Sequence, residues 1–195
     1  TLFTFKSSAS ESTSSSYVTG FTSDGFTVGG DTGINENNKE HMAMCWSAGD
    51  SNATNTSGSI TSTVRANTTA GFSIVSYTGA GGSSATIGHG LGTEPAFIIA
   101  KNRSNSGHWW VYHHLMIADD NYNAAGHATK LNETNGWQET DSYWKRVMPT
   151  SSVFTVGSDG DVNSNNDNYI AYCWAEIEGY SKMGIYTGNS NSDGN

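Results

Sequence analysis

Short apolar and aromatic runs alternate with polar, glycine-rich runs along most of the chain. Runs rich in Phe, Val, Ile, Thr, Tyr and Trp are separated by Gly, Asn, Asp and Ser clusters at intervals of roughly 8–14 residues, which is typical of an antiparallel sandwich or barrel. Helical periodicity is nearly absent, and residues 116–130 are expected to form a long loop or a short turn of helix. The pattern predicts strands over residues 17–22, 26–29, 41–48, 59–66, 72–78, 85–89, 96–101, 108–113, 153–157, 169–175 and 180–186.

An internal repeat organises these strands. Residues 21–46 align without a gap with residues 149–174, at an offset of 128 (149 − 21), and the strings FTVG and CW recur in both. The string AGFSIVSYTG (70–79) then resembles EGYSKMGIYTG (178–188) with one insertion. The first copy also carries a Ser/Thr/Asn-rich insert over roughly residues 48–69. We therefore predict a linker or entering strand (1–16), a first β-unit (17–148) and the start of a second unit packed on the same sandwich (149–195), whose remainder is expected beyond Asn195.

Composition and charge exclude several classes of protein. The chain carries 9 basic and 18 acidic residues, a net charge of −9, and no Lys/Arg cluster, so no nucleic-acid partner is expected. No apolar run approaches the roughly 20 residues of a membrane-spanning helix, so we expect no membrane insertion. Gly, Asn, Thr and Ser are poor helix formers, which excludes a helical bundle, while the six Trp and nine Tyr argue against disorder.

The two cysteines stand in matching apolar settings of the repeat. Cys45 lies in MAMCW and Cys173 in IAYCW, so we predict two buried free thiols, with a disulfide between them as the alternative. Trp46 and Trp174 follow these cysteines and are predicted to be core residues.

The segment 107–120 holds the densest set of chemically capable side chains. In a strand, His108, Trp110, Tyr112 and His114 would share one face. Histidine and tyrosine there could transfer protons, or two histidines could bind a metal beside Asp119 or Asp120, although core and rim packing is the commoner reason for such a pattern. Exposed aromatic rings beside amides also suit sugars, and the candidate ligand-binding residues are His108, Trp109, Trp110, Tyr112, His114, Trp137 and Trp144.

One acidic run is a candidate metal site. Oxygen ligands alternate from Asp159 through Asp161 and Asn163 towards Asp167, a partial resemblance to a calcium loop. Ile170 occupies the twelfth position, where such a loop needs a bidentate Glu, so a plain hairpin loop remains the simpler interpretation. The chain contains no G-x-S-x-G, P-loop or H-E-x-x-H motif.

Several strings resemble a repeated β-domain of bacteriophage tail-fibre and virion-surface proteins, especially marine and cyanobacterial ones. They are DGFTVGGDTGIN, SITSTVRANTTAGFSIVSYTG, ATIGHGLGTEPAFIIAKNR, WWVYHH, PTSSVFTVGS and YIAYCWAEIEGYSKMGIYTGN, within residues 20–190. The resemblance implies a concanavalin-type or jelly-roll sandwich with an adhesive or structural role in a fibre. It supplies no catalytic residues to transfer.

The sequence thus predicts an all-β antiparallel sandwich with internal duplication, acting on the virion surface. We expect a homo-oligomeric tail-fibre segment that contacts other virion subunits and a host-surface glycan, with no cofactor beyond a candidate calcium ion. One alternative is a polysaccharide lyase or hydrolase on a jelly-roll fold, using His108 or His113 with Tyr112. The other is a purely structural spacer or capsid decoration.

Overall fold

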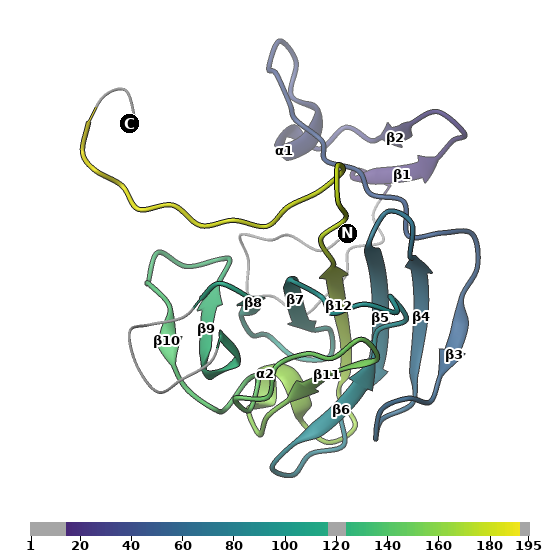
Figure 1. Ribbon diagram of the computed structural model, residues 1–195. Coiled ribbons are helices and arrows are strands. Elements are labelled where there is room, and N and C mark those ends of the chain that lie inside the picture. Colours follow the sequence, from purple (N-terminus) through teal and green to yellow (C-terminus); the bar gives the residue numbers. More distant parts are fainter. Residues whose placement is uncertain (1–14, 117–123, 192–195) are drawn as a thin grey trace.

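A large antiparallel sheet dominates the computed structural model, which describes residues 15–116 and 124–191 (Figure 1). Its eight strands follow the order β10-β9-β8-β7-β12-β5-β4-β3. Their bounds are β3 (Ala53–Asn55), β4 (Ser62–Asn67), β5 (Phe72–Thr78), β7 (Phe97–Asn102), β8 (Trp109–His113), β9 (His127–Lys130), β10 (Gln138–Glu139) and β12 (Asn168–Trp174). Strands β3, β9 and β10 lie outside the ranges that the hydrophobic pattern indicates, since their short polar runs lack that signal.

A second, smaller layer covers one face of this sheet. The strands β6 (Ala85–Gly88) and β11 (Val153–Val156) pair antiparallel and lie in front of the large sheet in Figure 1, beside the short helix α2 (Gly160–Asn163). Between the layers lie fully buried side chains from both, including Val75, Ile98, Ile87 and Val156. The predicted all-β sandwich is confirmed.

Strand β12 stands inside the large sheet although it comes last in sequence among the strands of the described residues. It pairs with β5 from Asn168 opposite Thr78 to Trp174 opposite Phe72, and on its other side with β7. Alternate residues Tyr169, Ala171 and Cys173 point into the core and are fully buried. The second copy of the repeat therefore supplies a strand that lies between two strands of the first copy's unit.

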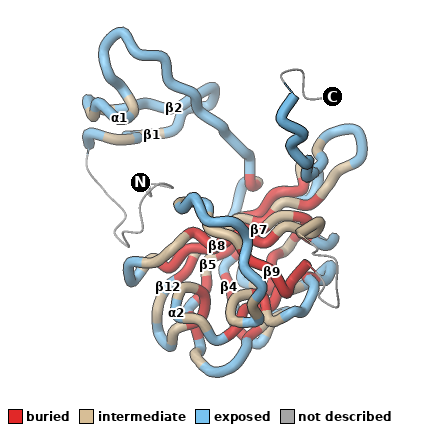
Figure 2. The backbone as a smooth tube through the Cα atoms, turned by 90° about the vertical axis from the view of Figure 1, so that its left-hand side faces the viewer, coloured by how far each residue is buried: buried red, intermediate tan, exposed pale blue. Residues whose placement is uncertain are grey.

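The first copy of the repeat behaves differently. It forms β1 (Val18–Phe21), β2 (Phe26–Val28) and the short helix α1 (Thr32–Asn35), which stand off from the sandwich and are mostly exposed (Figure 2). Residues 41–48 and 180–186 form no strand, so these two strand predictions are wrong. Both segments have strand composition, but in this structure neither lies between two partner strands as β12 does.

The same difference corrects two burial predictions. Trp46 is 50% exposed and packs edge-on against Trp174 at 5.6 Å, and Cys45 is exposed, so neither is a core residue. The prediction that Trp174 is a core residue is also wrong, because its ring is half-buried among Phe72 and Phe97, outside the core cluster. Cys173 is fully buried. Both cysteines are free, and burial raises the pKa of the Cys173 thiol to about 12.

Two further predictions concern poorly patterned segments. Residues 124–126 form the 3-10 turn η1 (Ala124–Gly126), in agreement with a short turn, but residues 127–130 form β9, so the expected loop is wrong there. Residues 117–123, which include Asp119 and Asp120, lie outside the described residues, as does most of the predicted linker 1–16. In the part of the chain that the structure describes, no helix has the length and apolar character needed to cross a membrane.

His89 gives the fold a testable pH dependence. This fully buried ring directly follows β6, with its Nε2 3.0 Å from the Thr150 carbonyl oxygen and its Nδ1 accepting from the Leu91 amide. Burial lowers the pKa of His89 below its usual value of 6.5. Below pH about 6.5 the unfolded chain therefore binds more protons, and stability falls as the pH drops through the folded-state pKa.

We expect the melting temperature to fall between pH 7 and pH 5, and to fall less steeply in the His89→Gln variant. The glutamine amide can still accept and donate hydrogen bonds but does not titrate. Thermal melts of both proteins across this range, followed by circular dichroism, give the two slopes. Parallel slopes would contradict the role assigned to His89.

Candidate functional site

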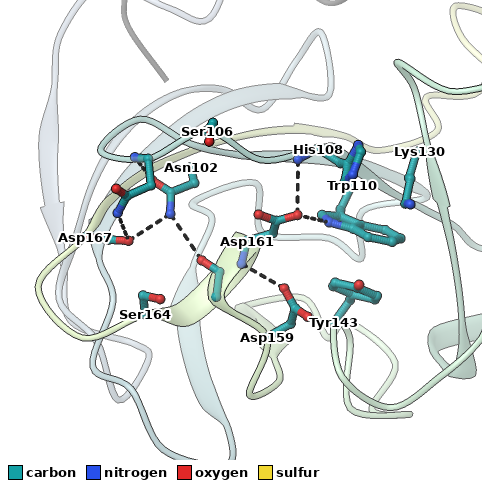
Figure 3. Close-up of a pocket in the computed structure, with 12 residues that line it drawn as sticks. Asn102, Ser106, His108, Trp110, Lys130, Tyr143, Asp159, Asp161, Ser164 and Asp167 are labelled. Carbon is teal, nitrogen blue, oxygen red and sulfur yellow. Dashed lines mark hydrogen bonds between the residues drawn. The ribbon is translucent and has the colours of Figure 1, made fainter. Parts of the chain in front are cut away.

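An open cleft of about 520 Å³ lies where the β7–β8 loop, β9 and the segment around α2 meet (Figure 3). Three carboxylates face one lysine ammonium across it, so the cleft is acidic. Its lining is formed by Asn102, Asn105, Ser106, His108, Trp110, Lys130, Tyr143, Asp159, Gly160, Asp161, Ser164 and Asp167.

Asp161 ties the sheet to α2 at the centre of this cleft. Its Oδ2 accepts hydrogen bonds from the indole Nε1 of Trp110 at 2.8 Å and from the backbone amide of His108 at 3.1 Å. A Cβ at Gly107 would stand 2.0 Å from Asp161 Oδ1, so any other residue there would displace this carboxylate. The Asp161 carboxylate therefore holds the β7–β8 loop in place.

Trp110 is the largest ring at the cleft, but both of its faces are covered. Tyr143 stacks on it with ring centroids 3.5 Å apart, and Lys130 Nζ lies 5.3 Å from the Trp110 ring centroid. The side chain is 1% exposed, so it offers no face to a ligand. Tyr143 is the partly exposed ring of the pair. Burial, with Asp159 and Asp161 nearby, raises the pKa of its phenol, which stays neutral and able to donate a hydrogen bond.

The other wall is a network of amides and one carboxylate. Asn102 Nδ2 donates to Asp167 Oδ2 at 2.9 Å and to the Gly160 carbonyl oxygen at 3.1 Å. Asn105 Nδ2 donates to the same Asp167 oxygen at 2.8 Å. Asn102 is buried whereas Asn105 and Ser106 are exposed, so a ligand would meet the two exposed side chains first.

His108 is the one predicted ligand-binding residue that is partly exposed in the cleft. Its ring Nδ1 lies 3.5 Å from Glu133 Oε1 and 3.4 Å from Asn132 Nδ2. Its backbone amide is held by Asp161, as described above. The ring therefore stands at the rim, between the cleft and the loop that follows β9.

The three residues of the predicted calcium site have protein partners. Asp159 is the N-cap of α2 and accepts from the Asp161 amide, while Asp161 holds β8. Asn163 is buried, accepting from the Ala80 amide and donating to the Gly157 and Gly81 carbonyl oxygens. Within residues 15–116 and 124–191, no group of three or more His, Cys, Asp and Glu side chains is placed to hold a metal ion. Calcium binding stays a prediction.

Three further predicted ligand-binding residues pack inside the protein. Trp109, Tyr112 and Trp144 are 3%, 1% and 2% exposed. Trp144 Nε1 donates to the Val111 carbonyl oxygen, and the Tyr112 hydroxyl donates to Met148 Sδ at 3.6 Å. The structure therefore gives these rings packing roles. Trp137 is the exposed tryptophan of the predicted set, standing edge-on to His127 with centroids 4.7 Å apart.

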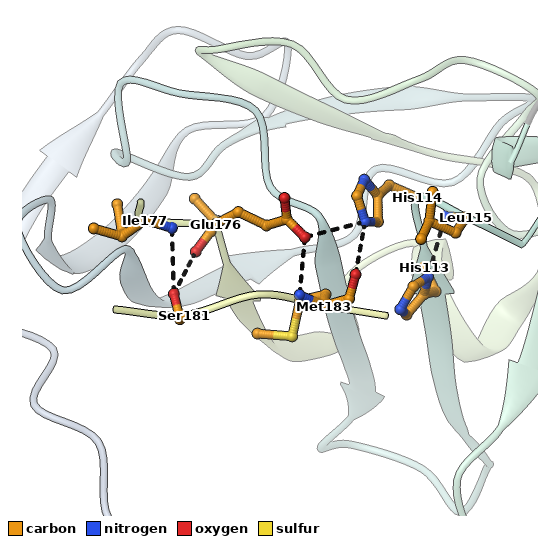
Figure 4. A network of polar contacts seen from close by, with 8 residues as sticks. His113, His114, Leu115, Glu176, Ile177, Ser181 and Met183 are labelled. Atoms are coloured by element: carbon orange, nitrogen blue, oxygen red, sulfur yellow. Dashed lines mark hydrogen bonds and ion pairs between the residues drawn. The ribbon is translucent and has the colours of Figure 1, made fainter. Parts of the chain in front are cut away.

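His114 belongs to a separate polar network at the other end of β8 (Figure 4). Its Nε2 lies 3.1 Å from the Met183 carbonyl oxygen and 3.5 Å from Glu176 Oε1, which in turn accepts from the Met183 amide. Burial, and then the neighbouring His114, lower the pKa of His113. The network fastens the segment after β12 to β8. His108 and His114, predicted to share one binding surface, are therefore split between two places.

The ligand-binding residues named individually from the sequence did not include Asn102, Asn105, Lys130 or Tyr143, all of which line the cleft. The polar run KNRSNSG between two apolar strands was the available signal, because binding residues concentrate on loops that a rigid sheet positions. Tyr143 and Lys130 give no local signal, since their neighbours in the cleft are distant in sequence.

Fold and cleft together define an all-β sandwich protein with an acidic, polar surface cleft. The chain belongs to the family described as Domain of unknown function (DUF7483), which matches residues 1–195. No curated protein matches the chain. No solved structure matches it either.

Proposed function

We propose that this chain is a structural and adhesive protein of a bacteriophage virion, a tail-fibre segment whose acidic cleft contacts a glycan on the host surface. The observation that carries the glycan contact is the convergence of amides, hydroxyls, carboxylates and a tyrosine on one open cleft. The virion setting rests on the sequence strings that resemble phage fibre domains. In that setting the protein would lie on the virion exterior and assemble with further copies and other virion subunits.

The chemistry of the cleft suits a sugar. Each sugar hydroxyl both donates and accepts a hydrogen bond, and Asn105, Ser106 and Tyr143 offer donors and acceptors close together. The volume of about 520 Å³ falls in the range of small-molecule sites. Asp159, Asp161 and Asp167 outnumber Lys130, so a neutral glycan is favoured over a sialylated or sulfated one, which the carboxylates would repel.

The enzyme alternative draws less support from the site. Tyr112, its proposed proton-transfer residue, is buried with its hydroxyl on Met148, and burial raises the pKa of that phenol. A general acid or base must reach the substrate within hydrogen-bond distance, which a residue in the core does not. The spacer alternative differs from our proposal by having no ligand at all.

A glycan-array screen of the purified chain, with and without calcium, tests this proposal. We expect binding to a neutral glycan without cleavage, and binding of the Asn105→Ala variant about fivefold weaker, since one hydrogen bond to a ligand contributes about 1 kcal/mol. Asn105 is exposed, so its removal leaves the fold intact. The Trp137→Ala variant is the matched control, because that ring is exposed outside the cleft.

The other outcomes are distinct. Loss of binding in Trp137→Ala with full binding in Asn105→Ala would move the glycan to the exposed tryptophan. Cleaved product would establish the enzyme alternative. An array without any hit would remove the adhesive role and leave the structural one.

A further inference from the structure

The exposed N-terminal segment repeats the internal contacts of the segment that closes the sandwich. Asp31 Oδ1 accepts from the Gly33 amide at 2.8 Å, as Asp159 Oδ1 does from the Asp161 amide at 2.8 Å, and these caps start α1 and α2. Both pairs stand at the repeat offset of 128 residues (159 − 31). The two short helices thus have the same local design.

Longer-range contacts within each copy match as well. Asn35 Nδ2 donates to the Gly29 carbonyl oxygen at 2.8 Å, and Asn163 Nδ2 donates to that of Gly157 at 3.0 Å. After each helix an asparagine takes a left-handed backbone, with φ of 60° at Asn38. Its counterpart in the second copy has φ of 65°. The loops therefore follow one path.

One matched contact uses different side chains for the same task. The Ser164 amide donates to the Tyr169 hydroxyl at 2.7 Å, and the equivalent Glu36 amide donates to His41 Nε2 at 3.2 Å. Both acceptors are the second residue of the segment that aligns with β12. The first copy is therefore a sequence-divergent version of the same closing segment.

The two copies differ in what surrounds them. Asn163 also bonds the turn after β5, through the Ala80 amide and the Gly81 carbonyl oxygen, and β12 pairs on both sides with β5 and β7. The equivalent residues 40–46 are exposed, with Met42 84% and Met44 66% accessible. The segment carries apolar side chains for a site that this sandwich already fills with β12.

We propose that residues 21–46 are the closing segment of a second sandwich, and that they dock into the groove between β5-like and β7-like strands of another copy of this fold that lacks its own β11 and β12. Residues 26–28 would then pair with its β6-like strand, and residues 40–46 would become its central strand. Ala43 and Cys45 would be buried there as Ala171 and Cys173 are here.

The partner molecule must supply the strands that would flank residues 40–46. Residues 178–188 resemble the sequence of β5 and are exposed at Tyr180 and Tyr186. They could therefore supply a β5-like strand beside residues 40–46 of another chain. A strand in the position of β12 also needs a β7-like strand on its other side. The partner must therefore carry the equivalent of β4 to β9, which is a copy of the fold itself. This inference concerns assembly and does not depend on the glycan proposal.

Exchanging the two segments within the full-length chain tests the fit. In the exchange variant, residues 149–174 are replaced by the sequence of residues 21–46, which has equal length. We expect it to fold with a cooperative thermal transition, because the inserted segment closes the groove between β5 and β7. The thiol at position 173 should then react with a thiol reagent at least about 100-fold more slowly than Cys45, since reaction requires the sheet to open.

A second variant with a smaller replacement separates a failure of the loop from a failure of residues 40–46. It replaces only residues 160–167 by residues 32–39, leaving β11 and β12 in place. If this variant folds and the full exchange shows two fast thiols without a cooperative transition, residues 40–46 do not fit the groove and the proposal falls. Failure of both variants would overturn the equivalence of the loops as well. The full exchange carrying Asp in place of its Ala43-derived alanine should lose both the transition and the slow thiol.

Discussion

The Ala171→Asp substitution is expected to abolish the cooperative unfolding transition of this chain. Ala171 is fully buried in β12, opposite Val75 on one side and Ala100 on the other. The buried side chains of the core cluster to which it belongs are aliphatic or aromatic, apart from the Cys173 thiol. An unpaired carboxylate there costs several kcal/mol, comparable to the whole stability of a domain of this size. Circular dichroism during heating measures the loss.

Ala43→Asp is the matched control, since Ala43 stands at the equivalent position of the repeat. It is exposed, and surface substitutions usually change the free energy of unfolding by less than about 0.5 kcal/mol. We expect the melting curve of this variant to overlie that of the parent chain. Equal destabilisation by both substitutions would mean that residues 40–46 are buried in solution.

Asn163→Ala should lower the free energy of unfolding by about 3 kcal/mol. The buried Asn163 side chain satisfies the Gly157 and Gly81 carbonyl oxygens and the Ala80 amide, and a buried polar group left without a partner costs about 1–3 kcal/mol. Since the three bonds join α2 to β11 and to the turn after β5, their loss also loosens the second layer. Urea titration followed by tryptophan fluorescence gives the change.

Asn35→Ala provides the comparison, because the Asn35 side chain is exposed and donates to the Gly29 carbonyl oxygen. Water can replace that bond, so about 0.5 kcal/mol or less is expected. A loss below about 1 kcal/mol for Asn163→Ala would show that water reaches its partners too.

The central strands could be predicted from residue pattern alone. Residues 72–78 were predicted as a strand and form β5 with the same bounds, and the prediction for 85–89 differs from β6 by one residue. The apolar run after Pro95 likewise forms β7. Each has β-branched or aromatic residues bounded by turn residues, so local signals were sufficient.

The strands 41–48 and 180–186 were predicted by the same signals and are absent. They carry apolar residues as β12 does, although fewer of them are β-branched or aromatic, and a strand also needs neighbours to satisfy its backbone. Whether neighbours are present is a property of the tertiary fold. A repeat in the sequence identifies equivalent segments without saying which of them has its partners.

The cleft could not be predicted from the sequence for a related reason. Asn105 meets Asp167, and Trp110 meets Asp161, across sequence separations of 62 and 51 residues. The register that brings them together is set by the pairing of β12 with β7 and by the position of α2. The expected period of two did place Trp110 and Tyr112 on one face, and both lie in the core cluster. It gave no indication that this face was the inner one.

The position of β12 has a consequence for how the protein is made. During translation β5 and β7 emerge first, and each leaves one edge without a partner until residues 168–174 leave the ribosome. Exposed strand edges template association with other chains, so nascent copies on one messenger are at risk of joining through these edges. Sequence-distant pairing also slows folding. Slower translation upstream of the β12 codons would prolong the time for which these edges are unpaired. We therefore expect it to raise the fraction of chains that associate through these edges and misfold.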